Sequence, residues 1–200
     1  MNEYVITRVD GTPDWSAIPS LSMEYVYKTG TTPVQAWAQI AYDDEQLFVH
    51  LWAKEENIRV EEFGPLANTW EDSCLEFFFS PIEGDPRYIN LETTCGGAFY
   101  LGVGENRHKL LRLLPEGEQI PFVTKPALID GGWEVSYSLS YQLLRLVFPT
   151  FAPKSGDILR ANCYKCGSLT KLPHWLSWAP LDCQPLDFHK PEFFGKMIFG

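Results

Sequence analysis

Apolar and polar residues alternate along much of this chain, as they do in half-buried β-strands. Between residues 34 and 42 the odd and even positions separate cleanly, with Val34, Ala36, Ala38, Ile40 and Tyr42 on one face and Gln35, Trp37, Gln39 and Ala41 on the other. The acidic turn 43–45 (Asp-Asp-Glu) then leads into a second such run, LFVHLWA. Two strand patterns joined by an Asp-rich turn predict a β-hairpin.

The same reasoning extends over the rest of the chain. Further strands are predicted at Cys74–Ser80, Arg87–Thr93, Ala98–Val103, Trp133–Leu139, Asp157–Tyr164 and Lys196–Phe199. Turns rich in Pro and Gly separate them. A helical pattern is found in Ser140–Phe148, where Ser140 can cap the first turn and the following proline ends the last. We therefore expect an all-β fold, an antiparallel β-sandwich of the jelly-roll or immunoglobulin-like two-sheet kind, with one short helix.

The length and composition support this expectation. A chain of 200 residues suits a single domain, and no repeat, low-complexity tract or linker divides residues 1–200. Aromatic residues make up 14% of the chain, with seven tryptophans, and Gly and Pro contribute 15 residues each. Aromatic residues suit strands and Gly and Pro suit turns, so many short strands are favoured.

The charge narrows the range of partners. Sixteen basic residues against 26 acidic ones give a net charge of -10. Nucleic acids and anionic membrane surfaces are polyanions that need a basic footprint, so neither is an expected partner. The first ten residues lack the features of a signal peptide, and no apolar run is long enough to span a membrane. We expect a cytoplasmic protein, or a secreted one if a leader has been removed.

The cysteines predict no disulfide framework and no metal site. There are five, Cys74, Cys95, Cys163, Cys166 and Cys183, without a secretory signal. Cys163 and Cys166 form a CxxC pair, but it lies in ILRANCYKCG, which has the pattern of a strand. Residues three apart on a strand point to opposite faces, so these are expected to be buried or half-buried thiols.

Two tryptophan-containing segments could carry binding chemistry. Trp70 stands in the polar segment NTWEDS just before the predicted strand from Cys74. In that strand Glu76 shares a face with Cys74 and Phe78, where an ionised carboxylate is costly unless a ligand or a cation pairs with it. Near the C-terminus Trp175 and Trp178 stand three apart in a loop-like segment. Aromatic faces with a few polar neighbours suit sugars, although such tryptophans can equally close one end of the core.

A third segment, DFHKPEFFG, contains His189 three residues before Glu192. The pair could bind a metal or His189 could donate a hydrogen bond to a ligand, but a lone His with a lone Glu favours a structural role.

In this order the segments resemble the family 9 carbohydrate-binding modules, and the resemblance covers most of the chain. The matching pieces are DWSAIPSL, AYDDEQLFVHLWAKEENI, TWEDSCLEFFFSP, RYINLETTCGGAFY, GWEVSYSLSYQLL, LRANCYKCG, and LSWAPL with DFHKPEFFGKMIF. The resemblance implies a β-sandwich that holds the end of a mono- or oligosaccharide between two tryptophan rings. Trp70 matches the first of them and Trp178 the second, with Trp175 as the competing candidate. Glu76 matches a carboxylate that binds sugar hydroxyls.

Other positions of the family pattern stay open in this sequence. Asn90, Arg107 and Asn162 are candidates for the amides and the arginine that complete the sugar hydrogen bonds. No cofactor is expected, although some members of the family bind structural calcium. Asp43, Asp44 and Asp72 offer oxygen ligands for it without the regular spacing of a strong calcium loop.

Three alternatives to sugar binding remain. A glycoside hydrolase, or an accessory domain in carbohydrate catabolism, would use two carboxyls among Glu76, Glu92 and Glu134, but the sequence marks out no pair. A haem or cofactor binder would need an axial ligand such as His50 or Met23. The last alternative is a packing domain without a ligand. The remaining tryptophans are assigned to packing, with Trp37, Trp52 and Trp133 in the core and Trp15 as an N-terminal plug.

Overall fold

The computed structural model describes residues 2–27, 33–64, 67–114 and 122–200. Its strands are β1 (Glu3–Arg8), β2 (Leu21–Ser22), β3 (Tyr25–Val26), β4 (Gln35–Tyr42), β5 (Gln46–Lys54), β6 (Cys74–Ser80), β7 (Tyr88–Thr94), β8 (Phe99–Gly104), β9 (Leu110–Arg112), β10 (Lys125–Ile129), β11 (Gly132–Ser140), β12 (Ile158–Gly167), β13 (His174–Ser177) and β14 (Gly195–Phe199). The α-helix is α1 (Tyr141–Arg145), and short 3₁₀ helices are η1 (Trp15–Ala17), η2 (Thr69–Glu71) and η3 (Pro191–Phe193).

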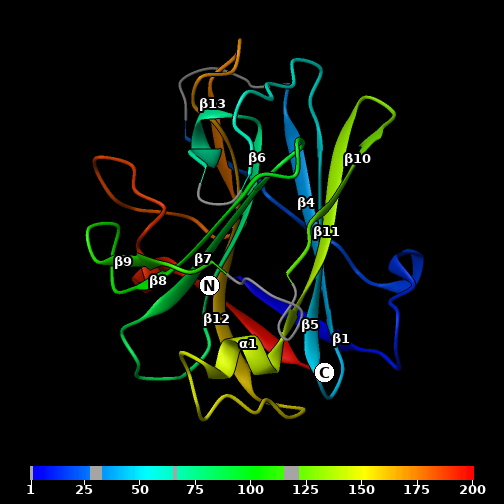
Figure 1. Ribbon diagram of the computed structural model, residues 1–200, viewed down its shortest axis with the longest axis vertical. Helices are drawn as coiled ribbons and strands as arrows, with labels where there is room; N and C mark the ends of the chain where they lie inside the picture. The colour runs from blue at the N-terminus through cyan, green and yellow to red at the C-terminus, as the bar shows by residue number, and fades with distance from the viewer. Residues whose placement is uncertain (1, 28–32, 65–66, 115–121) are drawn as a thin grey trace.

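The strands form two layers that face each other across one core. Sheet A has the order β14-β12-β6-β7-β8-β9. Strand β13 also pairs with β12, and β3 pairs with β13. Sheet B has the order β10-β11-β5-β4, with β2 beside β4. Figure 1 shows β6, β7, β8 and β12 on one side of the molecule and β4, β5, β10 and β11 on the other. The expected β-sandwich with one short helix is confirmed.

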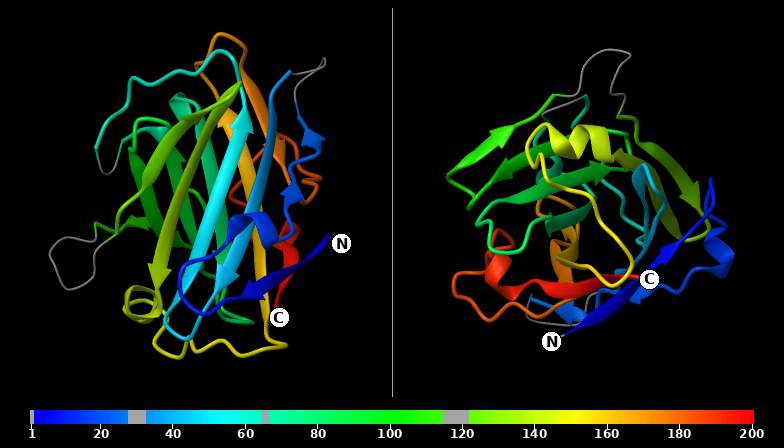
Figure 2. Two further views of the ribbon diagram at one scale, coloured as in Figure 1. Left: turned by 90° about the vertical axis from the view of Figure 1, so that its right-hand side faces the viewer. Right: turned by 90° about the horizontal axis from the view of Figure 1, so that it is seen from below.

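Strand β1 joins the two sheets along one side. Its first part runs parallel to β14, from the pair Glu3↔Lys196 to the pair Ile6↔Phe199. Its last two residues run parallel to β4. All other strand pairs between described residues are antiparallel, so the sandwich departs from a purely antiparallel one only at this join. Figure 2 shows β1 in dark blue beside the red C-terminal strand.

The predicted hairpin of β4 and β5 is confirmed in register. Trp37 lies opposite Trp52, and the Asp43 carboxylate closes the turn by accepting the backbone N–H of Glu45 and Gln46 at 2.8 and 2.9 Å. The predicted helix is confirmed but shorter, because only one turn with its cap forms. The Ser140 hydroxyl accepts the N–H of Leu143 at 3.1 Å, as the sequence indicated.

The core lies between the inner faces of the two sheets. On β6 the side chains of Leu75, Phe77 and Phe79 point into it. Cys74, Glu76 and Phe78 lie on the opposite face of the strand, as the alternation predicted. On β12, Cys163 belongs to the core and Cys166 to the outer face of sheet A. The CxxC cysteines thus point to opposite faces, which confirms that prediction.

Two of the tryptophans assigned to the core are not in it. Trp133 is fully buried between the sheets, but Trp37 and Trp52 lie half-buried on the outer face of sheet B. Their rings stack on each other with centroids 5.8 Å apart. The reason is the alternation itself, since Ala36 and Ala38 occupy the inner positions of β4. Trp15 in η1 contacts the same outer face through the ring of His50, 5.2 Å away.

Strand β13 was expected as a loop. It pairs with β12 over four residues, with Trp175 opposite Cys166. The sequence pattern also misses five short strands, β1, β2, β3, β9 and β10. Each has two to six residues, and their alternation of apolar and polar positions did not mark them as strands. Among the described residues no helix is long and apolar enough to cross a membrane.

Candidate functional site

The outer face of sheet A, turned away from sheet B, carries a pocket with a volume of about 790 Å³. This size is typical of small-molecule sites, which usually combine apolar walls with a few convergent polar groups. The pocket is lined by Tyr27, Trp70, Glu76, Asn90, Glu92, Tyr100, Arg107, Leu110, Arg112, Cys166, Ser168, Trp175, Pro185, Leu186, Phe188 and His189. Six residues proposed from the sequence as ligand-binding are therefore brought together here: Trp70, Glu76, Asn90, Arg107, Trp175 and His189.

The floor of the pocket is built by adjacent strands of sheet A. Glu76 comes from β6, Asn90 and Glu92 from β7, and Cys166 from β12. Strand β6 pairs with β12 on one side and with β7 on the other, so these side chains project from one continuous surface. Alternate residues of each strand point to this face, so the backbone hydrogen bonds between the strands fix the positions from which the floor side chains project.

The two tryptophans reach the pocket from segments far apart in the sequence. Trp70 lies in η2 with 36% of its surface exposed, and its ring meets that of Tyr100 edge-on at 6.2 Å. The Trp70 carbonyl accepts hydrogen bonds from the Ser168 N–H at 3.2 Å and the Cys166 thiol at 3.4 Å. Trp175 lies in β13, where its carbonyl accepts the N–H of Tyr27 at 3.0 Å. Both backbones are therefore anchored, which leaves large aromatic surfaces at the pocket.

Two carboxyl groups lie side by side on the floor. Glu76 and Glu92 are opposite each other across β6 and β7, with 2% and 3% of their surfaces exposed. The protonated Glu76 carboxyl donates to the Cys166 sulfur, and the Thr69 hydroxyl donates to Glu92. Burial raises the pKa of Glu76 well above its usual value, with Cys166 and Glu92 adding to the effect. Burial also raises the pKa of Glu92, so protons are favoured on this floor.

Asn90 is the clearest sign of a ligand on this floor. Its side chain is buried, with 1% of its surface exposed, and its amide lies close enough to Glu92 to lower the pKa of that carboxyl, yet neither the amide nitrogen nor the amide oxygen meets hydrogen-bond geometry with a described residue. Buried polar atoms without partners are rare in proteins because each costs about 1–3 kcal/mol. A bound group with hydroxyls would satisfy both atoms.

His189 and Arg107 also line the pocket, and both have protein partners. The Tyr88 hydroxyl pairs with His189 Nδ1 at 2.7 Å, and Arg107 forms an ion pair with Asp187 at 2.7 Å. Burial, with a smaller contribution from Arg107, lowers the pKa of His189 to about 4. His189 is therefore neutral near pH 7. Glu192 pairs with Lys190 at 3.7 Å.

Trp178 and Asn162 are not brought to the pocket. Trp178 has 5% of its surface exposed and belongs to the core between the sheets, where its ring packs against Gly195 so closely that a Cβ there would lie 2.6 Å away. Asn162 is fully buried and its amide bonds to the N–H and carbonyl of Ala179 at 2.8 and 3.0 Å. The position of the second tryptophan at the pocket thus falls to Trp175, which sits three residues earlier and on a strand.

The other candidate residues lie apart from each other. Asp44 pairs with Arg8 at 2.9 Å, and the buried Asp72 is bound by Arg59 and by the N–H groups of residues 61 and 62. Met23 is buried in the core, while His50 lies on the outer face of sheet B. His50 is bound there by Gln39 and Glu134, each at 3.0 Å. Among the described residues, neither the oxygen ligands proposed for calcium nor the axial ligands proposed for haem form a cluster.

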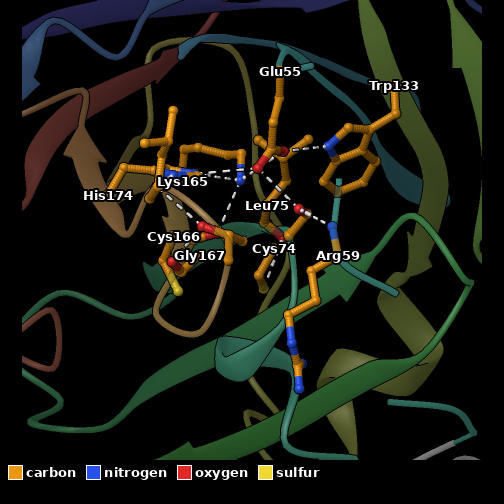
Figure 3. Close-up of polar contacts among 12 residues, drawn as sticks. Glu55, Arg59, Cys74, Leu75, Trp133, Lys165, Cys166, Gly167 and His174 are labelled. Carbon is orange, nitrogen blue, oxygen red and sulfur yellow. Dashed lines mark hydrogen bonds and ion pairs between the residues drawn. The ribbon is translucent and has the colours of Figure 1, made fainter. Parts of the chain in front are cut away.

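A second buried carboxylate, Glu55, lies between the two sheets and has a full set of partners. Its oxygens contact Lys165 Nζ at 3.1 Å, the Trp133 indole N–H at 3.0 Å and the Ser73 hydroxyl at 2.9 Å, as Figure 3 shows. Lys165 also donates to His174 Nε2 at 2.8 Å. Burial raises the pKa of Glu55, but Lys165 and Trp133 outweigh it and hold that pKa below its usual value. The smaller pocket beside this network, of about 330 Å³, offers no comparable unpartnered group among its described lining residues.

The sequence pattern missed several lining residues that the fold supplies. Glu92 was considered only for hydrolysis, although its spacing of two from Asn90 on one strand places both on the same face. Tyr27, Arg112 and Ser168 lie on short strands or loops with no pattern to mark them.

Comparison with known proteins shows the family and the fold. The family model for carbohydrate-binding family 9 matches residues 24–199. A solved structure of what is proposed to be a carbohydrate-binding protein from Bacteroides uniformis superposes with a TM-score of 0.83 at 25% identity, covering 99% of each chain. A family 9 module from Caldicellulosiruptor kristjanssonii in complex with cellotriose gives 0.68 at 12% identity, covering 99% of this chain and 93% of that one. The same kind of module in complex with glucose gives 0.65 at 13%, covering 100% and 96%.

Curated protein sequences give no match to the chain. The family model nevertheless spans most of the 200 residues, including the floor and both tryptophans of the pocket. The chain belongs to carbohydrate-binding family 9.

Proposed function

We propose that the chain is a non-catalytic carbohydrate-binding domain that holds the end of a mono- or oligosaccharide between Trp70 and Trp175. One observation carries the proposal. Two anchored tryptophans from distant segments line one pocket above a floor of buried polar side chains, and one of these, Asn90, has no partner. Trp178, the other candidate for the second ring, is enclosed in the core.

The chemistry of the pocket suits a sugar ring. The C–H faces of a pyranose are apolar and pack on aromatic rings, whereas its edge carries hydroxyls that both donate and accept hydrogen bonds. The Asn90 amide can do both, and so can a protonated carboxyl such as Glu76. Since burial raises the pKa values of Glu76 and Glu92, these carboxyls can donate as well as accept hydrogen bonds with the hydroxyls of a neutral polyol.

The relatives narrow the choice of test sugars. The Caldicellulosiruptor modules were solved with cellotriose and with glucose. Glucose and its β-1,4-linked oligomers are therefore the first ligands to test here, with xylobiose as a pentose comparison.

The placement of the carboxyls argues for binding without hydrolysis. Glycoside hydrolysis usually needs one carboxyl on each side of the scissile bond. Glu76 and Glu92 project from neighbouring strands of the same face, and Glu134 lies on sheet B beside His50. The described residues thus provide a single carboxyl pair, on one side of any sugar bound between the tryptophans.

The test is titration calorimetry with glucose, cellobiose, cellotriose and xylobiose on the reduced, metal-free chain. We expect binding of at least one sugar, and a loss of at least roughly tenfold in affinity for Trp70→Ala and for Trp175→Ala, since a buried aromatic anchor is typically worth 2 kcal/mol or more. Trp52→Ala is the matched control, because Trp52 is half-buried on the outer face of sheet B. Its affinity should equal that of the unmodified chain.

Two results would contradict the proposal. One is the absence of binding across the panel at millimolar sugar. The other is binding that survives in both Trp70→Ala and Trp175→Ala but falls in Trp52→Ala.

A further inference from the structure

The floor of the pocket contains a cluster of sulfur and oxygen ligands that sugar binding does not explain. The Cys74 sulfur and a carboxylate oxygen of each of Glu76 and Glu92 lie within 4.8 Å of one another, and all three residues are buried. The Cys166 sulfur accepts hydrogen bonds from the Cys74 thiol and the Glu76 carboxyl. Two thiols and two carboxyls therefore converge in one place.

The strand register explains why they converge. Cys74 and Glu76 are two residues apart on β6 and point to the same face. Cys166 lies directly opposite Cys74 on β12, and Glu92 directly opposite Glu76 on β7. The central strand thus places one thiol–thiol pair next to one carboxyl–carboxyl pair, and each pair spans neighbouring strands.

The cluster is costly for a protein that only packs or binds sugar. Thiols and carboxyls in a buried site must be either kept protonated or compensated by a cation. Cys74, Glu76 and Glu92 each have at most 3% of their surface exposed. The lysine next along β12, Lys165, points to the other face and is committed to Glu55. Beside the cluster, the unpartnered Asn90 amide independently indicates that the floor holds a bound group.

We propose that Cys74, Cys166, Glu76 and Glu92 form a binding site for a thiophilic divalent cation, best fitted by zinc. Zinc takes four ligands, with Zn–S near about 2.3 Å and Zn–O near about 2.1 Å, so its ligand atoms lie within about 4 Å of one another. The ligand atoms of Cys74, Glu76 and Glu92 lie within 4.8 Å of one another, close to this spacing, and Cys166 stands opposite Cys74 in the strand register. Calcium and magnesium are excluded by the two sulfurs, because they require six or more oxygen ligands.

The charges balance without any redox step. On binding, each thiol and each protonated carboxyl releases its proton to solvent, and the cation takes their place. Two thiolates and two carboxylates around Zn²⁺ carry the same net charge as a structural site of four cysteines. Arg112, which lines the pocket and favours the ionised form of Glu92, partly offsets it.

This inference shares Glu76 with the proposed sugar site, but it does not depend on sugar binding. Cys74 lies beneath the pocket and is absent from its lining, whereas Trp70 lines the pocket and is absent from the cluster. Variants at Cys74 and Trp70 therefore distinguish the loss of metal binding from the loss of sugar binding.

The experiment uses the full chain, kept reduced and stripped of metal with a chelator, then titrated with Zn²⁺ alone and separately with Co²⁺. We expect one Zn²⁺ per chain with sub-micromolar affinity, and a Co²⁺ complex with thiolate-to-metal charge-transfer absorption. Cys74→Ser and Glu92→Gln should each weaken zinc binding roughly tenfold or more. Cys74→Ser should leave sugar affinity unchanged, and Trp70→Ala should leave zinc affinity unchanged.

Cys183→Ser is the matched control, since Cys183 is a half-buried thiol outside the ligand group whose sulfur donates to the Asp187 carbonyl at 3.7 Å. Circular dichroism and a urea melt show whether each variant is folded, and Glu92→Gln replaces Cys74→Ser if the latter is not. The proposal is overturned if folded, reduced chain binds no stoichiometric zinc. It is also overturned if bound Co²⁺ shows no thiolate charge transfer, or if Cys183→Ser lowers affinity as much as Cys74→Ser does.

Discussion

Two buried carboxylate clusters lie on opposite faces of sheet A, and they differ in whether a cation neutralises the carboxylate. Glu55, between the sheets, is neutralised by Lys165 and bound by Trp133 and Ser73. Glu76, on the outer face, has the Cys166 sulfur as its partner and a second carboxyl beside it. Adjacent residues of one strand serve the two clusters, since Lys165 faces inward and Cys166 outward.

Whether a buried carboxyl has a complete set of protein partners distinguishes a structural cluster from a ligand-binding one. A buried charge with a complete set of protein partners stabilises one arrangement of the chain and has nothing left to offer a ligand. A buried group without such partners is kept neutral at a cost, and a ligand can relieve that cost. By this criterion the Glu55 cluster holds the two sheets together, and the Glu76 cluster belongs to the binding pocket.

Removing the cation of the inner cluster should have the largest effect. Lys165→Met leaves Glu55 buried without its counter-charge, so we expect the free energy of unfolding at pH 7 to fall by about 3–5 kcal/mol. Urea denaturation followed by fluorescence measures it. The double variant with Glu55→Gln should recover much of the loss, because no unpaired charge remains. A loss below about 1 kcal/mol in the single variant would show that the ion pair does not hold the sheets together.

The histidine at the pocket rim should give a pH dependence of intermediate size. The pKa of His189 falls from 6.5 to about 4 on folding, so between these values the unfolded chain binds more protons and stability rises with pH. The contribution is complete above pH 6.5 and is lost as the pH falls toward 4, amounting to at most about 3 kcal/mol. Urea denaturation of His189→Gln at several pH values should show a flatter profile than the unmodified chain. An equally steep profile in His189→Gln would contradict the assignment of this pH dependence to His189.

The smallest effect is expected at the outer carboxyl, and its sign is opposite to that at Glu55. Because the pKa of Glu76 is raised above its usual 4.5, its stability contribution is complete below that pH and is lost as the pH rises through the folded value. Glu76→Gln removes the ionisation and should stabilise the metal-free chain at pH 8, on the order of 1 kcal/mol. Glu55→Gln, measured the same way, should destabilise it. If both substitutions shift the unfolding midpoint in the same direction, the distinction between the clusters is wrong.

Much of the fold could be predicted because alternation with a period of two is a local signal. It gave the hairpin of β4 and β5, the two faces of β6 and the capped helix after Ser140. It could not separate the inner from the outer face of a sheet whose two sides both carry large side chains. Trp37 and Trp52 were therefore assigned to the core, although the small Ala36 and Ala38 face it.

The site was predictable in part for a related reason. Trp70 and Glu76 lie six residues apart around the start of one strand, so their proximity is local. The choice between Trp175 and Trp178 depends on β13, a four-residue strand that forms only when β12 is already in place. The meeting of Cys74 with Cys166 and of Glu76 with Glu92 depends on the register between strands, which no single segment of sequence contains.

The join made by β1 has a consequence for the timing of folding. Glu3 pairs with Lys196, so the contact that joins the two sheets unites the first and last strands of the chain. Such a contact cannot form on the ribosome until β14 has left the exit tunnel, and it closes the longest loop in the domain at the greatest entropic cost. We expect the nascent chain to wait with an additional open edge on each sheet, and to become resistant to protease only when β14 has emerged and paired with β1.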